Sequence, residues 1–104
     1  MSFFKTPMYR NRKLLDLAKK GEVCFFCFQH KPLAFAHSNQ SRDGKGGKVK
    51  AHDYRIALAC LECGYEIDNG NKYSRAERIE KWEEAHRLTI AWLFDNGHLE
   101  VIEK

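Results

Sequence analysis

Four cysteines carry the clearest chemical pattern in this chain, because they fall into two C-x2-C pairs, Cys24 with Cys27 and Cys60 with Cys63. A C-x2-C turn offers two sulfurs to one metal ion, and two such turns complete the tetrahedron that zinc prefers, with each sulfur at about 2.3 Å. The alternatives are two disulfides in an exported protein or one thioredoxin-type redox pair. The N-terminal residues lack the apolar core of a signal peptide, and redox chemistry needs only one pair. We therefore predict a structural Zn²⁺ site and a cytoplasmic location.

Residues 38–53 (SNQSRDGKGGKVKAHD) are polar and rich in glycine, which predicts a long exposed loop outside the core. Residues 1–55 hold twelve basic and four acidic side chains, a net charge of +8, whereas residues 56–104 hold six and ten, a net charge of −4. A basic half suits a phosphate backbone, although a plain solvated surface is the alternative. We predict that DNA is the partner. The loop residues expected to contact it are Arg42, Lys45, Lys48 and Lys50.

Cap, turn and periodicity signals predict the elements that would position these residues. The capping box at Ser74–Glu77 starts a long helix, whose apolar residues recur at steps of three and four until Asn96-Gly97. Trp82, Trp92 and Phe94 on it fit a core, and an aromatic face left over would serve a homodimer through this helix. The other expected elements are a helix from Thr6-Pro7 to Gly21, strands over 33–37, 54–59 and 99–102, and a helical turn over 64–69.

These elements predict a single domain over residues 1–104. Its expected parts are an N-terminal helical arm (1–21), a zinc-knuckle core (22–72) that contains the basic loop (38–53), and a C-terminal helix with a short strand (73–104). The longest apolar run, Ile56–Leu61, is far too short to cross a bilayer, so no membrane association is expected.

The order of motifs resembles the treble-clef zinc fingers of HNH nucleases, because a strand ending in His37, a polar loop and a second strand lie between the two knuckles. A more specific resemblance, over about residues 14–93, is to the small prophage-encoded YbcO-like nuclease family. The segments that carry it are Ala34–His37, the glycine-rich loop, Asp53, Ala59–Cys63, Glu66–Asp68 and Trp92-Leu93. It implies an α+β fold: a small zinc-stabilised treble-clef domain with the HNH-like ββα-metal arrangement, flanked by an N-terminal helix and a long C-terminal helix.

The same resemblance implies a catalytic site outside the cysteines. Hydrolysis of a phosphodiester needs a base to deprotonate water and a cation to neutralise charge on the phosphate. By position, His37 would be the base and Asp68 a ligand to Mg²⁺ or Mn²⁺. Asp53 or His52 would supply a second ligand or orient His37. A histidine at a strand end is otherwise a hydrogen-bonded structural residue.

Two positions depart from the family pattern. Many HNH sequences have Asp or His where this chain has Ala36, and related nucleases have His where it has Gly64. Either the cation site is rebuilt from His37, His52, Asp53 and Asp68, or catalysis is lost and only binding remains. We expect a metal-dependent DNA endonuclease or nickase of the HNH type in phage or prophage DNA metabolism. The alternative is a non-catalytic four-cysteine zinc module that binds nucleic acid or a host protein.

Overall fold

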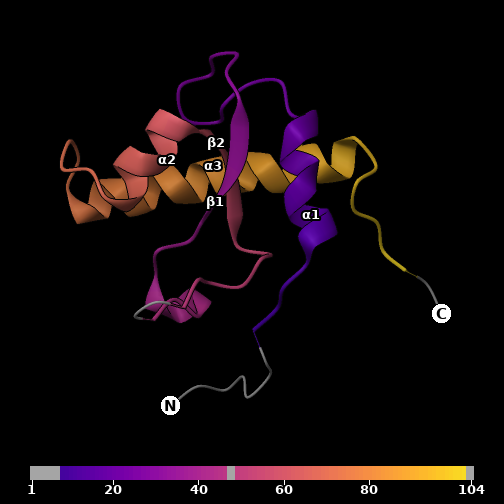
Figure 1. Ribbon diagram of the computed structural model, residues 1–104, viewed down its shortest axis with the longest axis horizontal. Helices are drawn as coiled ribbons and strands as arrows, with labels where there is room; N and C mark the ends of the chain where they lie inside the picture. The colour runs from indigo at the N-terminus through magenta and orange to yellow at the C-terminus, as the bar shows by residue number, and fades with distance from the viewer. Residues whose placement is uncertain (1–7, 47–48, 103–104) are drawn as a thin grey trace.

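Two strands and three helices form the α+β fold of this chain, whose computed structural model describes residues 8–46 and 49–102 (Figure 1). Two short 3₁₀ turns, η1 and η2, accompany them. In chain order the elements are α1 (Arg12–Asp16), η1 (Leu17–Lys20), β1 (Leu33–His37), η2 (Ser41–Asp43), β2 (Ile56–Cys60), α2 (Leu61–Asp68) and α3 (Arg75–Asp95). Within the described ranges no helix has the length and apolarity needed to span a bilayer.

The two strands form an antiparallel hairpin in which Leu33 pairs with Cys60 and His37 pairs with Ile56. The first strand confirms the predicted range 33–37. The second strand was expected to start at residue 54 and starts two residues later, because Arg55 still belongs to a turn and its N–H donates to the carbonyl of His52 at 3.0 Å. All five residues of β2 are buried. This burial explains why the strand is apolar throughout instead of alternating.

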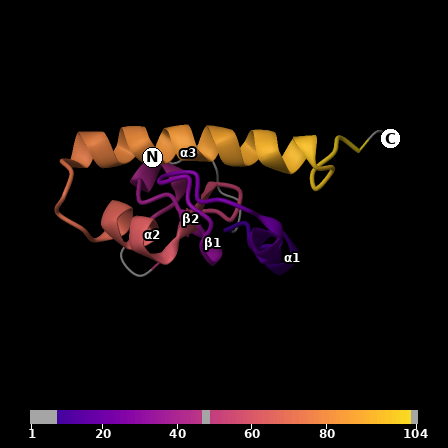
Figure 2. The same cartoon turned by 90° about the horizontal axis from the view of Figure 1, so that it is seen from above.

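α3 packs across the hairpin as a separate layer and closes the outer edge of β2 (Figure 2). The hydroxyl of Thr89 accepts a hydrogen bond from the N–H of Leu58 at 2.9 Å, and Nδ1 of His86 lies 2.7 Å from the carbonyl oxygen of Ile56. Trp82 reaches further and donates from its indole nitrogen to a carbonyl of β1 at 3.1 Å. Thr89 and His86 therefore satisfy edge groups of β2 that would otherwise need water or a third strand.

The core lies between α3 and the hairpin and extends to both short helices. Towards α2 it contains Ala57, Ile67, Trp82 and Ala85. Towards α1 it contains Leu14, Ile56 and Leu93. Of the aromatic residues expected in the core, Trp82 is buried and Trp92 packs against the α1 side, whereas Phe94 is exposed.

The long C-terminal helix begins and ends where the sequence predicts. Both halves of the capping box between Ser74 and Glu77 are present, and Gly97 adopts a φ of 73° just beyond the last turn. The strand expected over 99–102 is absent from the described residues. The N–H of Leu99 instead donates to the carbonyl of Leu93, which folds the chain back on the helix end, and the residues that follow are exposed.

The N-terminal helix starts later than predicted. Thr6 and Pro7 lie outside the described residues, and Met8–Asn11 are not helical. α1 starts at Arg12, with the side-chain oxygen of Asn11 accepting from the N–H of Leu14 at 3.0 Å. The preceding residues are extended because the carbonyl of Tyr9 accepts from the N–H of Asp53 at 3.0 Å. A contact 44 residues away along the chain therefore overrides the local helix signal.

The basic loop over 38–53 is partly buried, contrary to the expectation that it lies outside the core. Ser38, Ala51 and Asp53 are among the most buried residues of the chain. Two ion pairs of Arg55 hold the loop to the rest of the molecule: its Nε lies 2.9 Å from Asp43 in the loop, and its Nη2 lies 2.5 Å from Glu83 on α3. Glu83 is distant from the loop in sequence, so the composition of the loop alone could not predict its ordered, partly buried structure.

Candidate functional site

The four cysteine sulfurs converge where the hairpin meets α2. All four lie within 4.8 Å of one another, and Sγ of Cys27 is 3.9 Å from Sγ of Cys60. None of the four forms a disulfide. Four sulfurs at about 2.3 Å from a central zinc would be separated from one another by about 3.8 Å. The spacing fits, so this cluster can hold a metal ion such as zinc, as the sequence predicted.

Backbone N–H groups prepare one of these sulfurs for metal binding. The N–H groups of Phe26 and Cys27 donate to Sγ of Cys24 at 3.3 and 3.5 Å. Burial disfavours the thiolate, but backbone hydrogen bonds from Cys27, Cys60 and Phe26 outweigh it and lower the pKa of Cys24 to about 7. Burial and the neighbouring cysteines raise the pKa of Cys63. A metal ion would reverse that effect, because it replaces the proton on each sulfur.

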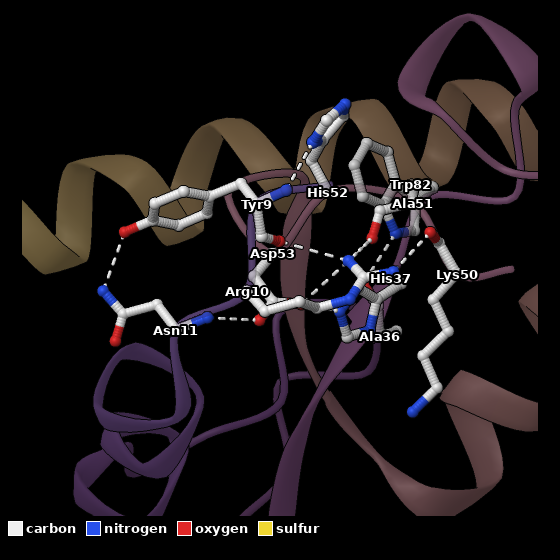
Figure 3. Close-up of polar contacts among 10 residues, drawn as sticks. All are labelled: Tyr9, Arg10, Asn11, Ala36, His37, Lys50, Ala51, His52, Asp53 and Trp82. Atoms are coloured by element: carbon white, nitrogen blue, oxygen red, sulfur yellow. Dashed lines mark hydrogen bonds and ion pairs between the residues drawn. The ribbon is translucent and has the colours of Figure 1, made fainter. Parts of the chain in front are cut away.

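A second polar cluster centres on His37, the last residue of β1. Its Nε2 lies 2.8 Å from Oδ1 of Asp53, and its side chain is 16% exposed (Figure 3). Asp53 is buried at the far end of the basic loop. The pair therefore joins the two ends of that loop, and it fixes the orientation of the imidazole ring.

The N-terminal arm holds Asp53 in place. The N–H of Asn11 donates to Oδ2 at 2.7 Å, and Nη1 of Arg10 lies 3.5 Å from Oδ1. Burial raises the pKa of Asp53, but the hydrogen bonds from His37 and Asn11 and the charges of His37 and Arg10 together lower it below its usual value. Arg10 also donates to the carbonyls of Lys50 and Ala51, at 2.8 and 2.7 Å (Figure 3).

Sequence reasoning missed Arg10 and Asn11 as members of this cluster. Both were included in the N-terminal helical arm, and nothing near them in sequence points to Asp53. Their roles depend on the extended backbone before α1, which brings the arm against the end of the loop.

A groove of about 810 Å³ runs beside β1 and α2. One end, here called the polar end, is lined by His37, Ser38, Lys45, Lys50 and Asp68. The hairpin register places Leu33 at the opposite end, next to Cys60, and there Pro32, Leu33 and Leu61 form the apolar end. Asn39, two residues after His37, donates to the backbone carbonyl of Asp68 at 3.5 Å, which ties the end of α2 to the end of β1.

The four residues considered as a rebuilt cation site do not form one cluster. His37 and Asp68 line the same groove, but the ring of His52 stacks on Tyr54 at 4.9 Å and its Nδ1 accepts from the N–H of Tyr9 at 3.0 Å. Asp53 is buried behind His37 and orients it. In residues 8–46 and 49–102, three or more possible metal ligands converge only at the cysteines.

The structure separates the basic loop residues that were expected to act together. Lys45 and Lys50 line the groove. Arg42 instead lies 3.1 Å from Glu83, a contact that directs it to α3. Lys48 lies outside the described residues. Two of the four predicted phosphate contacts are therefore placed at the polar end of the groove.

Comparisons of this chain with protein-family models, with curated proteins and with solved structures find no match.

Proposed function

We propose that this chain is a metal-dependent DNA endonuclease or nickase of the HNH type, built on a treble-clef domain whose cysteines hold a structural zinc ion. The proposal is carried by the pair of His37 and Asp53, whose 2.8 Å contact fixes a histidine at the polar end of the groove. Lys45, Lys50 and Asp68 line the same end and give it the charges that phosphate chemistry uses.

The hydrogen bond to Asp53 supports a base role for His37. The lowered pKa keeps Asp53 ionised near neutral pH, and an ionised carboxylate only accepts hydrogen bonds. The proton of the neutral imidazole must then sit on Nε2, which leaves the lone pair on Nδ1. A histidine oriented in this way can take a proton from water, and the nearby carboxylate stabilises the imidazolium that results.

Asp68 is the candidate cation ligand, because it is an exposed carboxylate that lines the groove. Mg²⁺ commonly uses one or two protein carboxylates and completes its shell with water and substrate phosphates, so a single aspartate is compatible with it or with Mn²⁺. When bound, the ion would neutralise charge on the phosphate. Lys45 and Lys50 would hold the neighbouring phosphates of the strand.

One observation favours the second candidate function, a non-catalytic zinc module that binds nucleic acid or a protein. Away from the cysteines, the described part of the chain brings together no group of three possible ligands. His37 and Asp53 would then serve only to close the loop. Activity measurements on His37 variants separate the two functions.

The test is nicking of supercoiled plasmid and cutting of single-stranded circular DNA with Mg²⁺ or Mn²⁺. We expect His37→Ala to lower the rate by roughly 10²- to 10⁴-fold, as for the loss of a general base, with DNA affinity and zinc content nearly unchanged. His37→Gln should lose as much activity, although its amide can still donate to Asp53. The exposed His30 provides the matched control, and His30→Ala should retain full activity.

Either of two results would remove the enzyme assignment. One is a wild-type protein that binds DNA and cuts neither the plasmid nor the single-stranded circle under any divalent cation. The other is a His37→Gln protein that cuts at the wild-type rate. Both would leave the binding module as the better account of the groove.

A further inference from the structure

We propose that the groove binds an unpaired nucleotide, so that the substrate is single-stranded or flapped DNA and not an intact duplex. This inference rests on the proposed function, because it takes the polar end as the place where the phosphodiester lies. It extends that function by using the other half of the groove, which the cleavage chemistry leaves unassigned.

One face of α2 lines the groove from its apolar end to its polar end. Leu61, Tyr65 and Asp68 recur at steps of four and three and therefore share that face, and all three line the groove. Leu61 is 87% exposed and Tyr65 is 60% exposed. Gly64, between them, adds no side chain, and a Cβ there would meet only Ala59, at 3.9 Å. Two large side chains, Leu61 at the apolar end and Tyr65 between Leu61 and Asp68 on this face, thus stand open to solvent in the groove.

This lining fits a base better than it fits a duplex. A duplex keeps its bases stacked inside and presents mainly phosphates and sugars, and these polar groups are not stabilised by contact with an apolar surface. An unpaired base has a free π face that stacks on aromatic side chains, and enzymes that work on extruded nucleotides receive the base in such pockets. The groove volume of about 810 Å³ lies within the usual range for small-molecule sites.

The charges of the lining favour a nucleic-acid strand over an extended peptide along β1. Lys45 and Lys50 line the polar end together with Asp68, so ammonium groups that can bind a phosphate lie there. A nucleotide joins an anionic phosphate directly to a flat apolar base, and the groove joins these ammonium groups to an apolar lining in the same way. We place the phosphate beside His37 and the base beside Tyr65.

The experiment measures binding of fluorescein-labelled oligomers by anisotropy. The probes are an oligothymidylate, an abasic strand with the same number of phosphates, and a duplex of the same length. Wild-type protein should bind the oligothymidylate most tightly. Tyr65→Ala should weaken that complex by roughly 5- to 150-fold, the range for loss of one stacked base, and leave abasic-strand affinity unchanged. Phe94→Ala removes an aromatic ring that is 50% exposed on α3 and should change neither affinity.

Three outcomes overturn the inference: equal or tighter binding of the duplex, an equal loss of affinity for the abasic strand in Tyr65→Ala, or no binding of any oligomer. The last would favour a peptide as the occupant. Cleavage is scored separately on the same probes. Cutting of the duplex without base-dependent binding would contradict this inference and support the nuclease. Base-dependent binding without cutting would support the nucleotide site and contradict the nuclease.

Discussion

At the scale of single residues, Asp53 connects three parts of the molecule. It accepts from His37 at the end of β1, from the N–H of Asn11 before α1, and from Arg10 on the same arm. A buried carboxylate needs such partners, because an unpaired charge away from water is costly. Asp53 therefore both anchors the loop and orients the ring of His37, the residue that we propose as the base.

The protonation of His86 predicts how the stability of the fold depends on pH. Burial lowers its pKa below the ordinary 6.5, although the bond to the carbonyl of Ile56 opposes that shift. Arg55 also lowers this pKa, whereas Glu83 and Asp43 raise it. Because the carbonyl only accepts, Nδ1 carries the proton of the neutral ring. Since the pKa of His86 is lower in the folded chain, the unfolded chain binds a proton at this histidine more readily as the pH falls.

The stability that His86 contributes is thus present above pH 6.5 and is lost as the pH falls below it. We expect the free energy of unfolding of wild type to decline relative to that of His86→Gln by up to about 1.4 kcal/mol per pH unit in this range. Urea denaturation at several pH values measures the difference, and release of metal from the cysteines cancels between the two proteins. Parallel pH profiles would contradict the assignment.

At the scale of elements, the cysteine cluster joins the first knuckle, which is the turn from Cys24 to Cys27, to the end of β2 and the start of α2. Apparent zinc-binding free energies of about 10–16 kcal/mol in small domains are as large as the total stability of most domains, about 5–15 kcal/mol. We therefore expect a strong chelator to unfold the chain, with loss of helical circular dichroism, and added zinc to restore it. Cys60→Ala should be unfolded even with zinc present.

The matched control for this prediction is an exposed polar residue beside the cluster. Gln29→Ala should fold and bind one zinc ion like wild type. A chain that contains no zinc when purified without chelators, or a melting temperature that chelation does not move, would mean that the cysteines do not hold the fold together.

Elements with strong local signals were predictable, whereas those fixed by distant contacts were not. The capping box set the start of α3, and the run from Leu33 to His37 gave β1 its correct bounds. The cysteine cluster followed from the C-x2-C spacing together with the exclusion of disulfides. The late start of α1 and the order of the basic loop depend on hydrogen bonds between the N-terminal arm and residues 50–53, which no local pattern encodes. The same limit explains why His52 was wrongly grouped with Asp68.

At the scale of the whole molecule, the hairpin is held along the outer edge of β2. α3 covers β2 through Thr89 and His86, and the first knuckle donates from the N–H of Phe25 to the carbonyl of Leu58 at 3.0 Å. β1 lies on the side of β2 away from α3 (Figure 2). Its residues line the groove. A fixed scaffold on one side and an open groove on the other is the arrangement that a binding or catalytic site requires.

The proposed nuclease activity requires a cation site in the groove, separate from the cysteines. Anomalous diffraction from crystals of the zinc-loaded protein soaked in Mn²⁺ tests this directly. We predict a manganese peak in the groove beside Asp68, together with a zinc peak among the four cysteines, and loss of the manganese peak alone in Asp68→Asn. Manganese absent from the groove, with zinc in place at the cysteines, would contradict the enzyme and leave a zinc-stabilised binding module.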